Sequence, residues 1–281
     1  MTTPRPVHRI TTDDSYGRIV EEAITEKPVT KKSLTRQSAL EAHSLAADRE
    51  RLEDVRVLVF DLDGTLIDSK LDLVQAVNAT LEHMGRPRIP NEDVGRYVGG
   101  GAALLVRRVL GTDATDEEAA SGLEHFLSYY SEHMLDNTVL YPGVREGLDL
   151  LKNLPMAVLT NKPVRFSEGI LDGLGLTPYF RFIYGGNSFE SKKPDPFGMN
   201  VLLRDFGVAP RQAMLVGDSD VDVKTARNAG AWACGVTYGF APEGLRACPP
   251  DLLVDSLEHL AGRLNGSVRS NGANSPARSS R

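Results

Sequence analysis

The chain has 281 residues, of which 41% are hydrophobic and 25% charged, and these values are ordinary for a globular protein of one or two domains. Its formal net charge of -6 argues against nucleic acid as the main partner, because binding to a phosphate backbone requires a concentrated basic surface. The sequence shows neither an apolar run of the roughly 20 residues that cross a bilayer nor a signal-like N-terminus, so we expect a cytoplasmic protein without membrane contact.

The first segment of the chain, residues 1–53, lacks the pattern of a folded core. It is rich in Thr, Ser and charged residues and shows at most one weak helix, near residues 33–52. We therefore expect an N-terminal extension that is largely disordered. The alternative interpretation is an arm that binds a partner.

Short apolar runs alternate with amphipathic segments between residues 54 and 264. Five runs have the length and composition of buried parallel strands: residues 55–60, 156–159, 182–184, 213–216 and 233–236. Strands that alternate with helices indicate βαβ units and a parallel sheet, because a parallel connection must cross over one face of the sheet. The sequence therefore predicts an α/β fold.

A helical stretch interrupts this alternation. Ser69 and Asp72 form a helix-start pair, and apolar residues then recur at the spacing of one helix face. Few strand signals follow until the Tyr-Pro-Gly turn that precedes the second core strand. We expect a helical cap of residues 68–141, inserted into a catalytic core made of residues 54–67 and 142–264.

The C-terminal stretch and the cysteines carry little functional signal. Residues 265–281 form a tail of Gly, Ser, Asn and Arg that contains too few apolar side chains to order itself, so we expect disorder. Cys234 and Cys248 have no metal-type spacing and cannot build a disulfide framework. Both are expected to be reduced thiols.

Polar residues follow four of the predicted strands at the point where each strand ends. They are Asp61 and Asp63, then Thr160 and Asn161, then Lys193 at the end of a longer loop, and then Asp218 and Asp222. In an open α/β sheet the ligand site lies at the carboxyl ends of the strands. Acids, a hydroxyl and a lysine at four such ends together predict a functional site at this edge.

Four motifs formed by these residues occur in a recognisable order. They are Asp61-Leu62-Asp63-Gly64-Thr65, then Thr160, then Lys193-Pro194, and then Gly217-Asp218-Ser219 with Asp222. Across nearly all of residues 54–264 the chain resembles the haloacid dehalogenase superfamily, specifically its phosphatase branch. The resemblance implies a Rossmann-like parallel sheet with helices on both faces and an inserted helical cap. It also implies a phosphomonoester hydrolase.

The resemblance implies a role for each acidic residue. Asp61 would attack phosphorus and form an aspartyl-phosphate, and Asp63 would protonate the leaving alkoxide and then activate water. Asp63 must therefore hold a proton when substrate binds. Mg²⁺ would be bound by Asp61, by the backbone carbonyl of Asp63 and by Asp218, while Asp222 would support the site from behind.

Three further residues are expected to bind the phosphoryl group. A carboxylate is a weak nucleophile, so the phosphoryl oxygens must be neutralised and held in line for attack. The resemblance assigns this work to Lys193 and to the Thr160 hydroxyl, with Asn161 as a possible helper. Lys192 adjoins Lys193, but the family motif has the lysine directly before proline.

Substrate choice is expected to reside in the glycine-rich segment Val98-Gly99-Gly100-Gly101-Ala102. Backbone amides of consecutive glycines can approach an anion closely, although a flexible turn between two helices is an equally good interpretation. Similar loops in bacterial phosphoglycolate phosphatases often read Val-Gly-Asn-Gly, and Gly100 replaces that Asn here. The resemblance implies 2-phosphoglycolate as substrate. Candidate contacts for its carboxylate are Arg107, Lys70 and Arg108.

Several other functions remain open on the sequence. Within the same superfamily they are a phosphatase for pyrophosphate, nucleotides or sugar phosphates, a sugar phosphomutase and a dehalogenase. Asp63 argues against the dehalogenase, because displacement of a halide needs no acid for the leaving group. Outside enzymes, the chain could be a metabolite-binding protein that keeps the fold. The expected partner is a small phosphorylated metabolite, and both a monomer and a homodimer are compatible with the sequence.

Overall fold

The computed structural model of the protein describes residues 52–94 and 97–268. The chain divides into two compact units, residues 1–50 and residues 51–281, and the described residues all belong to the second. The predicted N-terminal extension therefore lies outside the described residues, except for residues 52 and 53. Most of the predicted C-terminal tail lies outside them as well. Helix α11 (Leu257–Val268) includes the first four tail residues, which corrects the expected start of the tail at residue 265.

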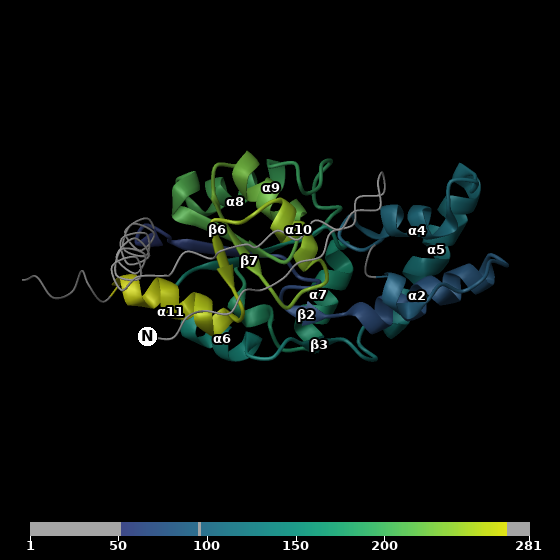
Figure 1. The fold of residues 1–281 in the computed structure, drawn as a ribbon, viewed down its shortest axis with the longest axis horizontal. Helices are drawn as coiled ribbons and strands as arrows, with labels where there is room; N and C mark the ends of the chain where they lie inside the picture. Colours follow the sequence, from purple (N-terminus) through teal and green to yellow (C-terminus); the bar gives the residue numbers. More distant parts are fainter. Residues whose placement is uncertain (1–51, 95–96, 269–281) are drawn as a thin grey trace, which may run out of the picture. The chain divides into compact units, whose positions relative to one another are not determined.

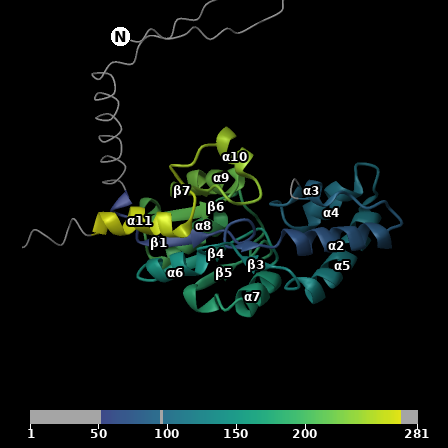
Figure 2. The ribbon, with the colours of Figure 1, turned by 60° about the horizontal axis from the view of Figure 1, so that its bottom comes forward.

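A parallel sheet of six strands forms the centre of the second unit (Figures 1 and 2). Its order is β5-β4-β1-β6-β7-β8, and every neighbouring pair is parallel. The strands are β1 (Val57–Phe60), β4 (Met156–Leu159), β5 (Phe182–Tyr184), β6 (Ala213–Gly217), β7 (Trp232–Val236) and β8 (Leu252–Val254). The α/β prediction is confirmed, as are its five strands. Strand β8 was not predicted.

Helices cover both faces of the sheet, because the central strands are apolar on both sides. Leu58 and Phe60 of β1 face one buried cluster, while Val57 and Val59 face the other. The first cluster is closed by α6 (Val144–Leu151), α7 (Val164–Gly173) and α11, and the second by α8 (Phe197–Phe206), α9 (Asp220–Asn228) and α10 (Pro242–Ala247). Two short 3₁₀ turns, η2 (Thr177–Tyr179) and η3 (Pro210–Gln212), complete the connections.

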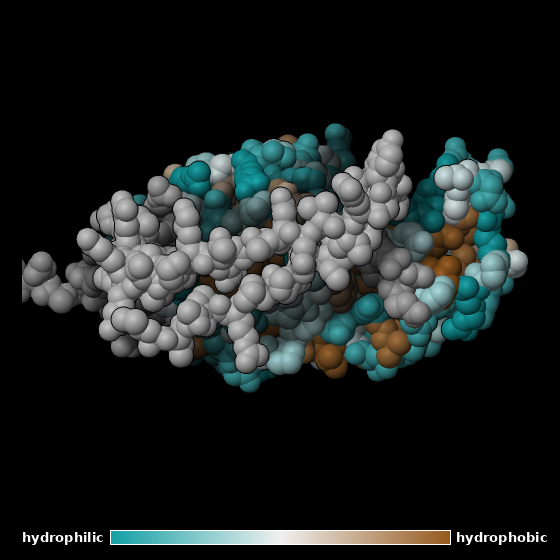
Figure 3. Space-filling model, viewed as in Figure 1, coloured by the Kyte–Doolittle hydropathy of each residue, from teal (hydrophilic) through white to brown (hydrophobic). Residues whose placement is uncertain are grey.

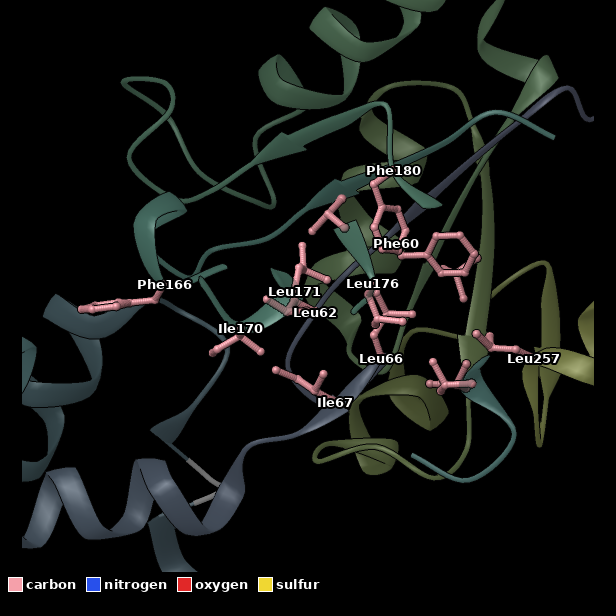
Figure 4. Close-up of a cluster of buried hydrophobic side chains, with 14 of the residues drawn as sticks. Phe60, Leu62, Leu66, Ile67, Phe166, Ile170, Leu171, Leu176, Phe180 and Leu257 are labelled. Atoms are coloured by element: carbon pink, nitrogen blue, oxygen red, sulfur yellow. The ribbon is translucent and has the colours of Figure 1, made fainter. Parts of the chain in front are cut away.

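The chain segment that follows β1 is anchored in the first cluster. Figure 4 shows Leu62, Leu66 and Ile67 lying near Ile170 and Leu171 of α7. The three side chains that follow β1 are 0% exposed, and burial of each contributes roughly 1.5–3 kcal/mol. The polar residues interleaved with them are therefore held on a rigid support rather than on a free loop.

Among the described residues, four α-helices lie between the short antiparallel strands β2 (Ile67–Asp68) and β3 (Val139–Leu140), and we call them the cap helices. They are α2 (Lys70–His83), α3 (Asn91–Val94), α4 (Ala102–Leu110) and α5 (Asp116–His133). Figure 2 shows them together on one side of the sheet. The helices expected between residues 68 and 141 are thus present. The division of the chain into a cap and a core domain at these residues stays a prediction.

The surface of the cap helices is mixed in polarity. Figure 3 shows hydrophobic residues among mostly hydrophilic ones at the right of the view, where the cap helices lie. Leu71 of α2 and Leu104 of α4 are among the exposed large apolar side chains. Within residues 52–94 and 97–268, no helix combines the length and the apolar character that a membrane crossing demands.

The carboxylate of Asp72 ties the start of the cap helices to their end. Ser69 occupies the N-cap position of α2, but it makes no side-chain capping bond, so the predicted helix-start pair is corrected. Asp72 is 0% exposed and accepts hydrogen bonds from the backbone and side chain of both Asn137 and Thr138, at 2.7–3.1 Å. These bonds fix where the chain leaves and re-enters the core.

We expect Asp72→Ala to lower the free energy of unfolding by on the order of 3 kcal/mol, because the change leaves buried donors without their charged acceptor. Equilibrium denaturation in urea measures this loss. The control is Asp113→Ala, whose side chain is 78% exposed beside Arg86 and should contribute less than about 1 kcal/mol. Equal losses in the two variants would contradict a structural role for Asp72.

Candidate active site

The polar residues predicted to form the site do converge at the carboxyl edge of the three central strands. Phe60 of β1 is in register with Val158 of β4 and with Val216 of β6, so these strands end at nearly the same level. Asp61 follows β1, Thr160 follows β4, and Asp218 follows β6. Because β1 lies between β4 and β6, Asp61 stands at the centre of this edge.

Lys193 joins two carboxylates at the base of the site. Its Nζ lies 2.6 Å from Asp222 Oδ1 and 2.9 Å from Asp61 Oδ1, and the lysine side chain is 3% exposed. Burial alone lowers the pKa of Lys193, but the Asp222 and Asp61 charges outweigh it and raise the pKa above its ordinary value. Lys193 is therefore a fixed positive charge. Asp222 also accepts bonds from the hydroxyl and backbone N–H of Ser219, so both its oxygens are occupied.

Three buried acids could hold a metal ion. Ligand oxygens of Asp61, Asp218 and Asp222 all lie within 4.8 Å of one another. Burial and the neighbouring charges of Asp222 and Asp61 raise the pKa of Asp218 to about 8, and burial, opposed by Lys193, raises that of Asp61 to about 6. Asp61 Oδ1 has the Lys193 ammonium 2.9 Å away and no further partner among the described residues. An oxygen-rich, negatively charged cluster fits a hard divalent cation.

Asp63 lies outside this acidic cluster and has different partners. Its carboxylate accepts a short hydrogen bond from Ser69 Oγ and ion-pairs with Lys162 Nζ, at 3.0 and 3.1 Å to its two oxygens. Lys162 Nζ also donates to the hydroxyl of Tyr130 at 2.7 Å. Tyr130 belongs to α5, so this chain of contacts links the core to the cap helices.

Lys162 was missed by the sequence analysis. It is 6% exposed; burial alone lowers its pKa, but Asp63 and Tyr130 raise it above the ordinary value. The available signal was its place two residues after Thr160, since a buried cation at a strand end needs an anionic partner. The position of Lys162 in the sequence did not predict which residues it contacts, because Tyr130 and Asp63 come from distant parts of the sequence.

Thr160 and Asn161 are both buried after β4 but are engaged differently. Thr160 Oγ1 accepts a bond from the Lys162 backbone N–H at 3.3 Å, which leaves its own O–H to donate. Asn161 Nδ2 donates to the carbonyls of Gly99 and Lys193, and its Oδ1 accepts from the Lys193 N–H. Both amide donors of Asn161 are thus used, so the predicted phosphate contact would cost one of these bonds. In this structure Asn161 positions its neighbours instead.

The glycine-rich segment of the cap helices meets the core at this point. Gly99 and Gly101 line the same cavity as the polar residues, whereas Gly100 does not. Arg107 lies outside the cavity lining, because its guanidinium bonds Asp116 and the Thr115 carbonyl at the start of α5. The structure thus places Arg107 in an exposed ion pair rather than at the cavity, against the expectation of a substrate contact.

A cavity of about 70 Å³ lies between the sheet edge and the cap helices. A cavity needs roughly 10–15 Å³ of such volume to hold one water, so this cavity is large enough for a small molecule. Its polar lining includes Asp61, Asp63, Thr160 and Asp218, and its apolar lining comes largely from the cap helices and α7. An apolar roof over carboxylates excludes water and strengthens electrostatic interactions inside.

Gly64 permits the close approach of two motifs. Its φ is +80°, which L side chains rarely adopt, and an added Cβ would lie 2.3 Å from Asp218 Oδ2. That oxygen accepts hydrogen bonds from the backbone of Phe240 at 2.6 Å and Ala241 at 3.3 Å. The position of the Asp218 carboxylate thus requires glycine at residue 64.

A parallel sheet with acids at its carboxyl edge and helices over them is the arrangement of an α/β enzyme with a covered active site. Residues 58–236 match the model of the haloacid dehalogenase-like hydrolase family. Among curated relatives, the chain is 42% identical to "Phosphoglycolate phosphatase" of Pseudomonas putida, over 73% of this chain and 78% of that protein. It is 39% identical to "Phosphoglycolate phosphatase" of Chromobacterium violaceum, over 74% of this chain and 96% of that protein.

A solved structure gives the same result at the level of the fold. A crystal structure of a predicted phosphoglycolate phosphatase from Haemophilus somnus superposes with a TM-score of 0.71 at 32% identity, over 76% of this chain and 98% of that one. The chain belongs to the haloacid dehalogenase-like hydrolase family. It is an enzyme of the phosphatase type.

We expect Gly64→Ala to reduce phosphate release by about 100-fold, because displacement of a site carboxylate by about 1 Å has an effect of that size. Gly85→Ala is the matched control, since Gly85 also has a positive φ, +67°, but open space around its missing Cβ. Backbone strain of about 1–2 kcal/mol is common to both variants. Activity lost equally in both would show that strain, not the contact with Asp218, is responsible.

Proposed function

We propose that the chain is a Mg²⁺-dependent phosphomonoesterase that hydrolyses 2-phosphoglycolate to glycolate and phosphate through a phosphorylated Asp61. The observation that carries the proposal is the ion pair of Asp61 with Lys193, beside the buried acids and under a small covered cavity. The relatives' names support the substrate.

Asp61 is the proposed nucleophile. It lines the cavity at the centre of the sheet edge, and Lys193 lies 2.9 Å from its Oδ1. In the first step an Asp61 oxygen forms a bond to phosphorus while the bond from phosphorus to the ester oxygen breaks. Repulsion between the carboxylate and the phosphoryl oxygens opposes this attack, and the fixed charge of Lys193 offsets part of it.

Asp63 is the proposed acid and base. It lines the same cavity two residues after Asp61, where it would give its proton to the departing ester oxygen. In the second step Asp63 takes a proton from water, water oxygen bonds to phosphorus, and the bond to Asp61 breaks. Lys162 Nζ lies 3.0 Å from Asp63 Oδ1 and holds this side chain at the cavity.

The phosphoryl group is held by side chains from other strand ends. The free O–H of Thr160 is a suitable donor to one phosphoryl oxygen. The proposed metal ligands are Asp61, the Asp63 carbonyl and Asp218, while Asp222 holds Lys193 in place. When bound, Mg²⁺ supplies positive charge that neutralises the phosphoryl oxygens.

Residues 68–141 are proposed to act as a cap on a core of residues 54–67 and 142–264. The glycine-rich segment supports this, since Asn161 of the core donates a hydrogen bond to the Gly99 carbonyl. Its backbone amides are suited to an anionic substrate, and Gly101 immediately precedes α4. Withdrawal of the cap helices would expose the cavity to substrate and water.

We expect 2-phosphoglycolate to give the highest kcat/KM in a panel that also contains pyrophosphate, nucleoside monophosphates and sugar phosphates. Inorganic phosphate release with Mg²⁺ present is the measurement, and product analysis checks for isomerised sugar phosphate. A sugar phosphate ranked first, with isomerisation, would point to a phosphomutase instead. Hydrolysis of no compound in the panel would favour a metabolite-binding protein.

We expect Asp61→Asn to reduce turnover by about 10⁴-fold or more, because a carboxamide cannot form the aspartyl-phosphate. Asp172→Asn, an exposed position on α7, is the matched control and should keep full activity. Chelation of divalent cations should stop phosphate release by the unaltered enzyme, and added Mg²⁺ should restore it. Undiminished turnover by Asp61→Asn would overturn the mechanism.

A further inference from the structure

Lys162 is a buried cation in the cavity lining, and in the proposed chemistry it contacts Asp63 but not the substrate. Among the described residues that line the cavity, Lys162 is the one with a basic side chain, while Asp61, Asp63 and Asp218 supply acids. Lys193 is committed to Asp61 and Asp222. Desolvation of a buried ammonium costs free energy, so a position in the cavity indicates that the charge has a function there.

We propose that Lys162 and Tyr130 together bind the carboxylate of the substrate, and so select small phosphomonoesters that carry an acid group next to the ester carbon. The inference rests on the proposed function and names the residues that give it specificity. Lys162 comes from the core after β4, and Tyr130 comes from α5 of the cap helices. The proposed carboxylate-binding pair, Lys162 and Tyr130, is therefore complete only when the cap helices lie over the core.

Lys162 can reach a further acceptor by exchanging one of its bonds. Its ammonium carries three N–H groups, and within the described part of the chain its hydrogen-bond partners are the two Asp63 oxygens, at 3.0 and 3.1 Å, and the Tyr130 hydroxyl, at 2.7 Å. Because two of these bonds go to one carboxylate, a substrate carboxylate could replace one of them while Lys162 stays bonded to Asp63. A substrate carboxylate fits, since a charge-assisted bond is the strongest that an ammonium can make.

The hydroxyl group of Tyr130 can donate a hydrogen bond to the substrate. Its oxygen accepts the bond from Lys162, so its own O–H points elsewhere, and the structure gives it no further partner among the described residues. Tyr130 is 1% exposed, and burial raises its pKa to about 12. Its ring is held by Phe126 and Phe166, with centroids 5.7 and 5.3 Å away. The hydroxyl is therefore rigidly aimed rather than free to turn to solvent.

The position of Lys162 places it beside the leaving group rather than the phosphoryl group. Its carboxylate partner is Asp63, which the proposed mechanism sets at the ester oxygen. In 2-phosphoglycolate one carbon separates that oxygen from the carboxylate, so a cation next to Asp63 is within reach of it. Arg107, the earlier candidate for this contact, is engaged with Asp116 outside the cavity.

The test compares 2-phosphoglycolate with 2-hydroxyethyl phosphate, in which a neutral hydroxymethyl group replaces the carboxylate. We expect Lys162→Met to lower kcat/KM for 2-phosphoglycolate by about 10- to 100-fold more than for 2-hydroxyethyl phosphate, the range for a lost charged hydrogen bond. Tyr130→Phe keeps the ring and should reduce the same preference by about 5- to 10-fold. Lys152→Met, an exposed position at the end of α6, is the control and should leave the preference unchanged.

A preference that persists in both Lys162→Met and Tyr130→Phe would overturn the proposal. So would an equal loss with both substrates, because that result assigns Lys162 to holding Asp63 alone. Calorimetric titration of both compounds into Asp61→Asn, with and without Lys162→Met, measures recognition without turnover. If the unaltered enzyme releases no phosphate, the proposed function fails, and this titration still decides whether Lys162 recognises the carboxylate.

Discussion

Negative charge crowded at one edge of the sheet is the constraint on which the rest of the site depends. Asp61, Asp218 and Asp222 bring oxygens within 4.8 Å of one another in a largely dehydrated place, and the raised pKa values of Asp61 and Asp218 reflect burial and repulsion from neighbouring acids. Lys193 compensates part of that charge. Because the acids repel one another, the backbone must hold them, and it does so through buried side chains such as Leu62.

A second charged contact, separate from the first, connects the core to the cap helices. Asp63, Lys162 and Tyr130 form one chain of interactions, and the Asn161 bond to the Gly99 carbonyl forms another nearby. Movement of the cap helices away from the sheet would break both, whereas the acidic cluster on the core would stay intact. Asp63, the proposed acid and base, belongs to this second contact, so the proposed chemistry and the proposed selection of substrate meet at Asp63.

The family match covers both parts of the site. The matched residues, 58–236, contain all the strand-end motifs and also the cap helices, but a shared fold does not by itself select a substrate. Selection must come from the few groups that reach the cavity beyond the phosphoryl site. In this chain those groups include the glycine-rich segment, together with the Lys162–Tyr130 pair.

The amino-acid sequence was sufficient for the strands and for the acids that follow them. A buried parallel strand is a short apolar run, and a catalytic edge lies where such runs end, so Asp61 and Asp218 could be located from local pattern alone. Only the tertiary structure showed that Asp72 closes the base of the cap helices and that Arg107 points away from the cavity. It also supplied the contact of Lys162 with Tyr130, because residues 32 positions apart meet only when two separate elements pack together. Local periodicity decides which face of an element is buried, but long-range packing decides which polar side chains become partners.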